Sequence, residues 1–356
     1  MTAVATRTSA DVTSVRPSRS GLLRRGWSRG GGLALAVAVL LVVVLASIAY
    51  GSRPIALATV WDGLWSYDAT IDDHLIVRTL LVPRTMLGLL VGVGLGLAGA
   101  VMQGVTRNPL ADPGILGIEA GASLAVVIGI YTLGLGSFTG YVWLAFAGAA
   151  VASLVVYLLG SLGRGGATPV KLALAGAALS ALFGSLTTSI LLLDVSTLDQ
   201  FRFWVVGSLA GRDGEVVTGV APFIAVGALL AIGSARSLNT LALGDDIARS
   251  LGQRVGPARG IAALAVIVLA GGATAAAGPI GFVGLTVPHV ARAICGPDYR
   301  WILPWSAVLA PVLLLGADVV GRLVARPGEV QVGILTAIIG APFFVALVRR
   351  RKLAEL

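Results

Sequence analysis

Residues 278–292 read Gly-Pro-Ile-Gly-Phe-Val-Gly-Leu-Thr-Val-Pro-His-Val-Ala-Arg, an apolar stretch interrupted by two prolines, three glycines and one of the chain's two histidines. In a lipid bilayer, every backbone N–H and C=O group needs a hydrogen-bond partner inside the protein. Residues that break a helix are therefore tolerated at membrane depth only where other helices or a water-filled cavity cover the backbone. The stretch predicts a position inside an assembly of several membrane helices.

The composition predicts an all-α, polytopic membrane protein. The chain has 356 residues, of which 56% are hydrophobic and 12% are charged. Its mean hydropathy is +0.92, and its uncharged runs reach the length of about 20 residues that a helix needs to cross a bilayer. The formal net charge is +9. The arginines gather at the ends of apolar runs, so membrane topology explains them better than nucleic-acid binding does.

Ten apolar runs are candidates for membrane crossings. They are Gly31–Tyr50, Thr85–Val105, Ile115–Gly134, Gly140–Leu162, Leu172–Leu193, Val216–Gly233, Ile261–Ala277, Ile280–Val290, Trp301–Ala317 and Val332–Val348. The region between Arg259 and Arg292 holds about 32 uncharged residues, which at about 1.5 Å each exceed one bilayer. Two short crossings that separate near Gly278-Pro279 therefore fit better than one.

The predicted ten-helix transmembrane domain covers residues 31–348 and is flanked by two basic tails. Residues 1–30 are rich in Arg, Ser, Thr and Gly and lack apolar periodicity, so we expect them to be disordered. Arg24-Arg25 before an apolar run leaves a secretion signal as an alternative. The roughly 20 uncharged residues that follow are longer than a signal core of about 7–15, which favours an uncleaved first helix. Residues 349–356 form the second tail.

The distribution of basic residues predicts that both termini lie in the cytoplasm. With ten crossings and an inner N-terminus, nineteen of the 26 Lys and Arg residues fall on the cytoplasmic side and seven on the outer side. The opposite orientation would reverse this excess and break the positive-inside rule. Small residues also recur every four positions at Gly88, Gly92, Gly96, Ala100 and Gly104, and again at Gly176, Ser180 and Gly184, which indicates close helix packing.

Two polar blocks lie on the predicted cytoplasmic side. Residues 103–117 form a double-proline turn between the second and third crossings. Leu238–Gly252 is too polar to cross the bilayer and is patterned like a short amphipathic helix. Such a helix either lies on lipid head groups or docks a cytosolic partner.

The second block carries helix signals. Asp245 and Asp246 suit a helix N-terminus, Arg249 can pair with them at i+4 or i+3, and Gly252 can end the helix. We expect Ile247, Ala248 and Leu251 to line one face of it.

Three separated motifs resemble one family of membrane proteins. They are Asn-Pro-Leu-Ala at 108–111, Phe-Val-Gly-Leu-x-x-Pro-His-x-x-Arg at 282–292 and Gly-Ala-Pro-Phe-Phe at 340–344. In this order and spacing, together with the polar insert and Asp318 to Arg322, they resemble the FecCD-type ABC permeases that import iron-siderophore chelates, haem and cobalamin. The resemblance runs from about Arg78 to the C-terminus.

The resemblance implies a set of partners. A FecCD-type permease pairs with itself or a paralogue around a translocation path in the plasma membrane of a bacterium. Two cytosolic ATPase subunits lie below it, and an extracytoplasmic binding protein, in some systems a lipoprotein, delivers the chelate. Iron-siderophore is the first expectation for the cargo, with haem and cobalamin as alternatives, because side chains lining a dimer path cannot be identified from one sequence.

The resemblance also assigns residue roles. The insert at about 241–252 matches the coupling helix of the family, which transmits closure of the ATPase, and its candidate residues are Leu241, Leu243, Gly244, Asp245, Asp246, Ala248, Arg249, Leu251 and Gly252. Arg84 and Arg322 match outward arginines that receive acidic residues of the binding protein, with a snorkelling position at the membrane interface as the alternative for each. Leu81 replaces a further family arginine, and Arg78 lies one turn earlier. The structural motif residues are Asn108, Pro109, Gly284, Pro288, His289, Arg292, Gly340 and Pro342.

The sequence predicts no catalytic site, metal site or cofactor. It has no Gly-x-x-x-x-Gly-Lys-[Ser/Thr] run, so ATP hydrolysis must come from another polypeptide. His74 and His289 fall on opposite sides of the membrane, and the single Cys295 suits a packed apolar position. For His289, a hydrogen-bonded structural role is expected rather than proton transfer.

Two other classes of protein share some of these sequence features. An ion-coupled secondary carrier would also use broken helices and small-residue stripes, but it should show buried carboxylates. Glu119 and Asp318 are the two candidates, and both fall near a predicted membrane interface. A membrane enzyme would need a nucleophile or paired carboxylates within mutual reach, and no such arrangement is visible.

Overall fold

The structure, a computed structural model, describes residues 22–23, 26–51, 55–136, 138–162 and 168–349. Within these ranges the chain is helical and contains no strand. Its ten longer apolar helices are α1 (Gly26–Ala49), α4 (Val82–Thr106), α5 (Ile118–Leu133), α6 (Phe138–Ser161), α7 (Pro169–Leu193), α9 (Gly214–Gly233), α12 (Val255–Ala277), α13 (Val283–Cys295), α14 (Tyr299–Val324) and α15 (Val332–Arg349). Each overlaps one of the ten runs predicted from hydropathy, although α12 begins six residues before its run and α13 ends five residues after its run.

Seven of these helices, in the part of the chain that the structure describes, are long and apolar enough to cross a bilayer. The remaining three, α5, α13 and α15, are apolar but shorter. The break in the long uncharged region lies where it was predicted, because α12 ends at Ala277 and Gly278 and Phe282 adopt positive φ values of 76° and 68° before α13 begins. A side chain at Gly278 would collide with the carbonyl oxygen of Trp204.

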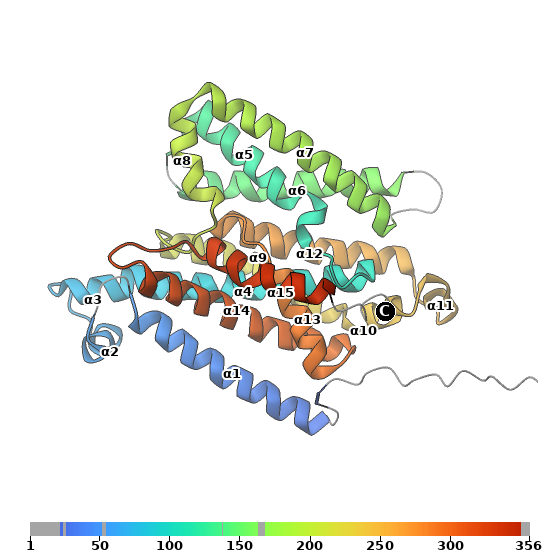
Figure 1. Cartoon of the computed structure of the whole chain (residues 1–356), viewed down its shortest axis with the longest axis horizontal. Coiled ribbons are helices and arrows are strands. Elements are labelled where there is room, and N and C mark those ends of the chain that lie inside the picture. Colours follow the sequence, from blue (N-terminus) through green and yellow to red (C-terminus); the bar gives the residue numbers. More distant parts are fainter. Residues whose placement is uncertain (1–21, 24–25, 52–54, 137, 163–167, 350–356) are drawn as a thin grey trace, which may run out of the picture.

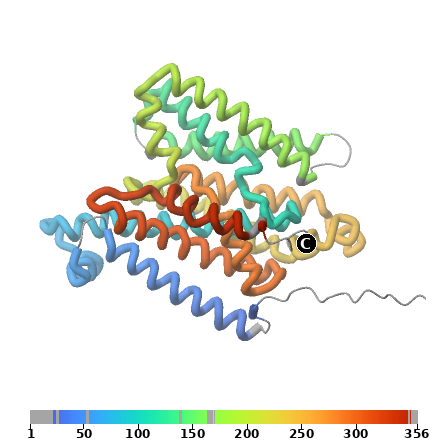
Figure 2. Tube along the Cα trace, in the orientation of Figure 1, coloured from blue at the N-terminus to red at the C-terminus, as the bar shows by residue number. Residues whose placement is uncertain are grey.

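Helix α4 forms the centre of the bundle. It packs against α9, α12, α13 and α14, while α5, α6 and α7 form a second group along one edge and α1 lies along the opposite edge (Figures 1 and 2). The predicted small-residue stripe lies at the α4–α14 contact, where Gly88, Gly92 and Gly96 have no room for a side chain beside Leu315, Pro311 and Ser306, respectively. Gly176 in the second stripe faces the backbone of Ile115, whereas Gly184 has no close neighbour in the described chain.

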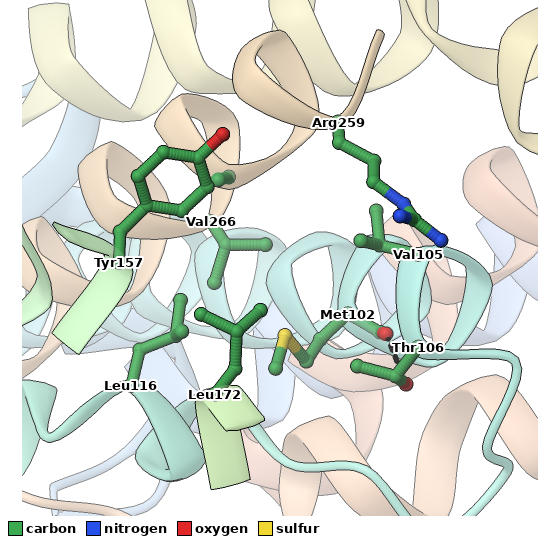
Figure 3. A pocket seen from close by; sticks show the side chains of 9 residues that line it. Met102, Val105, Thr106, Leu116, Tyr157, Leu172, Arg259 and Val266 are labelled. Carbon is green, nitrogen blue, oxygen red and sulfur yellow. Dashed lines mark hydrogen bonds between the residues drawn. The ribbon is translucent and has the colours of Figure 1, made fainter. Parts of the chain in front are cut away.

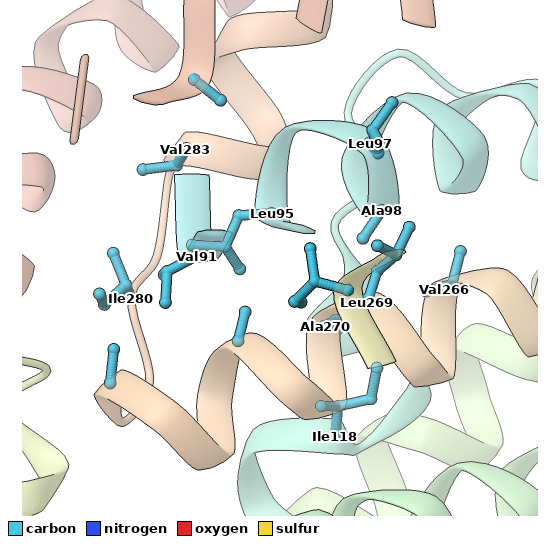
Figure 4. Close-up of a cluster of buried hydrophobic side chains, with 14 of the residues drawn as sticks. Val91, Leu95, Leu97, Ala98, Ile118, Val266, Leu269, Ala270, Ile280 and Val283 are labelled. Carbon is cyan, nitrogen blue, oxygen red and sulfur yellow. The ribbon is translucent and has the colours of Figure 1, made fainter. Parts of the chain in front are cut away.

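The main core lies between α4 and α12. In this core, Val91, Leu95 and Ala98 of α4 lie opposite Val266, Leu269 and Ala270 of α12 (Figure 4). Ile118, Ile280 and Val283 from neighbouring segments belong to the same buried cluster. At a typical 1.5–3 kcal/mol for each large apolar side chain removed from water, such contacts stabilise the helices against one another. Within a bilayer, close van der Waals packing takes over this role.

Short helices lie at both ends of the bundle. At one end are α2 (Leu57–Trp65), α3 (Asp72–Ile76), the π-helical turn η1 (Val77–Leu81) that continues into α4, and α8 (Val195–Val205). At the other end are α10 (Ala235–Ala242) and α11 (Asp245–Ser250), together with the start of α1 and the end of α15 (Figure 1). The 3₁₀ turn η2 (Pro113–Leu116) connects α4 to α5.

Three boundaries differ from the sequence predictions. Helix α1 begins at Gly26 inside the segment predicted to be disordered, and the backbone amides of Leu22 and Leu23 donate to the carbonyls of Ala293 and Ile294. Helix α14 extends seven residues beyond the predicted apolar run, to Val324. The single coupling helix predicted at 241–252 is two helices, because Gly244 at φ 107° separates α10 from α11. The rest of the predicted tails, 1–21 and 350–356, lies outside the described residues.

Candidate functional site

The α10–α11 element is fixed to the bundle by polar and apolar contacts. In α10, Leu238 and Leu241 are buried. The side chain of Asn239 accepts a hydrogen bond from the Tyr299 amide at 2.8 Å and donates one to Asp298 at 2.7 Å. These two bonds attach α10 to the first turn of α14, where Asp298 caps the helix.

Helix α11 follows several of the predicted patterns. It begins at Asp245, Arg249 pairs with Asp246 at 3.0 Å in an i+3 arrangement, and the chain leaves the helix through Gly252 at φ 81°. The prediction of one apolar face was wrong. Ala248 is buried against Leu241 and Val255, whereas Ile247 and Leu251 are exposed. The three residues therefore do not share one face of the helix.

The outward side of this element is apolar. Leu243, Ile247 and Leu251 each expose more than half of their surface, at 56%, 51% and 64%. Asp246 and Arg249 lie beside them and are also exposed. This mixture of apolar and charged side chains is typical of a protein contact surface.

The turn after α4 lies next to α11. Arg107 ends α4 in the left-handed conformation at φ 52°, and the Asn108 side chain accepts from the Leu110 amide at 3.0 Å before Pro109 leads away from the helix. The Arg107 guanidinium lies 3.4 Å from Asp245. The structure therefore brings together two blocks that the sequence places more than a hundred positions apart.

The motif residues of α13 lie in helix contacts. Gly284 packs against the backbone of Gly99 in α4, and the Gln103 side chain donates to the Leu285 carbonyl at 3.1 Å. Arg292 lies 3.4 Å from the Gln103 side-chain oxygen and 3.2 Å from the Tyr299 hydroxyl. Pro288 lies within the helix.

The same helix also meets α15. The rings of His289 and Phe343 lie in a T-shaped arrangement, with 6.2 Å between their centroids. Gly340 leaves room for the Phe282 side chain, and Pro342 lies in the same helix. These residues hold α13 between its neighbours, which agrees with a structural role. The hydrogen bond expected for His289 is not seen at its Nδ1 atom, which is buried without a partner among the described residues.

Four charged residues form a buried cluster at the opposite end of the bundle. Arg84 binds Asp318 at 2.7 Å and Glu329 at 2.7 Å. Arg322 binds Asp318 at 2.9 Å and donates to the Ser47 carbonyl of α1 at 2.9 Å. Asp318 is fully buried and 1% of Arg322 is exposed, so each charge is matched within the chain, as buried charges require.

The cluster corrects the prediction that Arg322 faces outward to meet a partner. Its i+4 partner Asp318 and the end of α1 enclose it, whereas Arg84 keeps 11% of its side chain exposed. Arg78 is exposed, and its guanidinium lies 4.6 Å from the centre of the Tyr67 ring.

A cavity of about 470 Å³ lies beside this cluster and is lined by Arg84, Arg212, Arg322 and Glu329 with apolar residues of α3 and η1. Sequence reasoning did not single out Arg212, which lies in an ordinary-looking Gly-Arg-Asp-Gly loop before α9. Burial lowers the pKa of Arg212 to about 10, against the opposing effect of Tyr141. Arg212 is therefore still charged near neutral pH, and it adds a positive charge to a cavity whose other arginines pair with Asp318 and Glu329.

The two carboxylates that an ion-coupled carrier could use lie in different surroundings. Asp318 is neutralised by two arginines. Glu119 lines a small cavity of about 10 Å³ together with Asp112 and Thr274, and no basic side chain lines it. Asp112 accepts a hydrogen bond from the Gly114 amide at 2.8 Å and caps η2. A cavity of this size holds about one water molecule.

Comparison with known proteins places the chain in a family. The model of the FecCD transport family matches residues 39–350. The chain is 45% identical over 313 residues to the ferric enterobactin transport system permease protein FepD of Escherichia coli, which covers 88% of this chain and 93% of that protein. It is 38% identical over 284 residues to the cobalamin import system permease protein BtuC of Halobacterium salinarum, covering 80% and 76%.

A solved structure has the same fold. It is "an inward-facing conformation of a putative metal-chelate type ABC transporter", with a TM-score of 0.79, 27% sequence identity, and coverage of 90% of this chain and 99% of that chain. The chain belongs to the FecCD transport family, as a multi-pass permease subunit of a bacterial membrane.

Proposed function

We propose that this chain is the permease subunit of an ATP-driven importer for iron(III)–siderophore complexes. The observation that carries this proposal is the 45% identity to a ferric enterobactin permease along 88% of the chain. The more distant identity of 38% to a cobalamin permease keeps cobalamin as an alternative, and haem is a second one. The chelate would pass between this subunit and a second permease subunit, either identical or a paralogue.

The orientation in the membrane is part of the proposal. Nineteen basic residues would lie on the cytoplasmic side and seven on the outer side if both termini are inside. The start of α1, the end of α15 and the α10–α11 element share one end of the bundle (Figure 1). This end is then cytoplasmic, and the cavity beside Arg84 lies at the outer end of the bundle.

The α10–α11 element would dock a cytosolic ATPase subunit. Its exposed Leu243, Ile247 and Leu251 lie beside Asp246 and Arg249. Asp246 and Arg249 also pair with each other at 3.0 Å, and α11 lies at the end of the bundle. An exposed mixture of apolar and charged side chains at this place favours a protein partner over the lipid surface.

The outer end would receive a substrate-binding protein, which some systems anchor as a lipoprotein. Arg78 and Arg84 are accessible in part, and Arg212 adds charge to the adjacent cavity. Acidic side chains of a partner would be attracted to this surface and steered to it. Arg322 would contribute by holding Asp318, and so would shape the surface without touching the partner.

In the proposed mechanism, binding of ATP closes the two ATPase subunits and moves both α10–α11 elements. The helices of each permease then tilt at their glycine contacts, and the path between the subunits changes its open side. The permease forms no covalent bond with its cargo.

Reconstitution tests the function. The complex, purified through a tag on this chain from its native membrane, is placed in liposomes with the binding protein and offered radioactive ferric enterobactin, ferric citrate, haem or cobalamin. We expect ATP-dependent accumulation of a ferric chelate. If only cobalamin or only haem accumulates, that compound is the cargo. Accumulation driven by an ion gradient without ATP would favour a secondary carrier.

A further inference from the structure

Two adjacent aspartates of α11 have different surroundings. One side-chain oxygen of Asp245, Oδ1, accepts a hydrogen bond from Arg259 of α12 at 2.9 Å and also lies 3.4 Å from Arg107 at the end of α4. Its side chain is 23% exposed. Asp246 is 99% exposed and pairs with Arg249 inside the same helix. Asp245 therefore connects α11 to the bundle, whereas the pair made by Asp246 stays within α11.

The contact with Arg107 depends on an unusual backbone. Arg107 and Phe282 are the two non-glycine residues with positive φ among those the structure describes, and such residues are uncommon in proteins. A Cβ atom added to Gly244 would lie 3.5 Å from Nη1 of Arg107. The guanidinium thus lies across the glycine that separates α10 from α11, and it links α11 to the turn that leads into α5.

Through Arg259, Asp245 is connected to α12 and to the place where α12 meets α4, α6 and α7. Arg259 is 13% exposed in its side chain and belongs to the second turn of α12. It lines a small apolar cavity with Val105 and Thr106 of α4, Tyr157 of α6 and Leu172 of α7. Figure 3 shows its guanidinium pointing toward the part of α4 that carries Val105 and Thr106. Asp245 is therefore bonded to a residue that lies where the ends of four long helices meet.

We propose that Asp245 is the positioning residue through which α11 moves α4 and α12. This inference rests on the proposed function, since an ATPase partner is what would displace α11. One carboxylate oxygen shared by guanidinium groups from two helices is a directional, charge-assisted contact. The apolar contact of Ala248 with Leu241 and Val255 can slide more easily. Without the carboxylate, α11 can still move with the ATPase, but its movement is no longer transmitted to α4 and α12.

The test measures the amount of ferric chelate transported for each ATP hydrolysed. It uses the liposomes described above, with whichever chelate the wild-type complex accumulates. In Asp245→Asn we expect this ratio to fall at least about fivefold, the lower end of allosteric coupling between sites. In the matched variant Asp246→Asn, which alters the docking surface, ATP hydrolysis and transport should fall together and leave the ratio unchanged. A ratio that is unchanged in Asp245→Asn, or lowered equally in both variants, overturns the inference.

Two further variants separate coupling from folding. Arg259→Gln should lower the ratio by no more than Asp245→Asn does, because the contact of Asp245 with Arg107 remains. The double variant should be no worse than Asp245→Asn alone, because that variant already removes the contact with Arg259. Asp245→Glu should recover part of the ratio. If the fold decrease of the ratio in the double variant equals the product of the two single decreases, the inference is overturned. Wild-type uptake without ATP would instead refute the proposed function, so the two failures are distinguishable.

Discussion

Arg84 of α4 donates to both carboxylate oxygens of Asp318 in α14, from Nη2 at 2.7 Å and from Nε at 3.0 Å. The two residues are 234 positions apart, and the pair is bidentate, which adds both strength and a fixed geometry. Asp318 also binds Arg322 at 2.9 Å. One buried carboxylate thus holds two guanidinium groups, and its removal would leave two positive charges without their main partner.

Asp318→Asn should therefore destabilise the folded chain strongly. Breaking a buried ion pair by removing one partner typically costs about 3–5 kcal/mol. The measurement is thermal unfolding of the purified permease in detergent. Asp199→Asn is the matched control, because Asp199 and its partner Arg202 are both more than half exposed, and such surface pairs contribute about 1 kcal/mol or less. Equal stability of the two variants would contradict a structural role for the cluster.

Glu329→Gln should strengthen binding of the substrate-binding protein. Glu329 is 27% exposed and binds Arg84 at 2.7 Å, so it occupies the guanidinium that an acidic partner would use. Neutralising it should raise the affinity roughly two- to fivefold, as expected for a partly exposed ion pair. Titration of the labelled binding protein onto reconstituted permease measures this. A lower affinity would mean that Glu329 itself contributes to docking.

Arg78→Glu tests the same surface by removing a positive charge instead of a negative one. Because Arg78 is exposed, reversing its charge should weaken binding of the partner and should reduce the salt dependence of the association rate. Arg322→Glu is unsuitable for this purpose, since it would place a second carboxylate beside buried Asp318. Salt dependence that is the same in Arg78→Glu and the wild type would exclude Arg78 from the docking surface.

Hydropathy predicted the positions of the long helices because each crossing needs about 20 apolar residues, and local composition decides this. The break at Gly278 was predictable for the same reason. The end of α14 was not, since the helix continues through Asp318 and Arg322 once these charges pair with each other and with Arg84. The i+4 spacing of Asp318 and Arg322 was a local signal of this pair.

The functional ends of the molecule depend on contacts between distant segments. The pairs Arg84–Glu329 and Arg107–Asp245 join positions whose proximity follows only from the packed helices. The separation of α10 from α11 depends on the φ of 107° at Gly244, which the residue type permits but does not require. Motifs could therefore single out the α10–α11 segment as a candidate for coupling, but they could not say which of its aspartates faces the bundle.

The N-cap of α8 gives a prediction of pH dependence. Hydrogen bonds from the hydroxyls of Thr197 and Ser196 lower the pKa of Asp194 to about 2, below the ordinary value of 3.8. A carboxyl group whose pKa is lowered by folding stabilises the folded state above its ordinary pKa, and this contribution is lost as the pH falls toward 2. Protection of the first-turn amides of α8 from hydrogen exchange should therefore decrease between about pH 4 and 2, and Asp194→Asn should remove this dependence. A dependence that persists in the variant would assign it to another group.

The α4–α14 contact predicts the effect of adding a single methyl group. A Cβ atom at Gly92 would lie 2.6 Å from the Cα of Pro311, so Gly92→Ala must push two backbones apart. Overpacking of this kind costs about 1–3 kcal/mol. Gly316→Ala in α14 is the matched control because no atom lies within 4 Å of its added Cβ, and Ala is favoured over Gly inside a helix by about 0.5–1 kcal/mol. In detergent, the unfolding temperature of Gly92→Ala should be lower than that of the wild type, and that of Gly316→Ala should be equal or higher. The reverse order would mean that α4 and α14 are not held at this distance by their small residues.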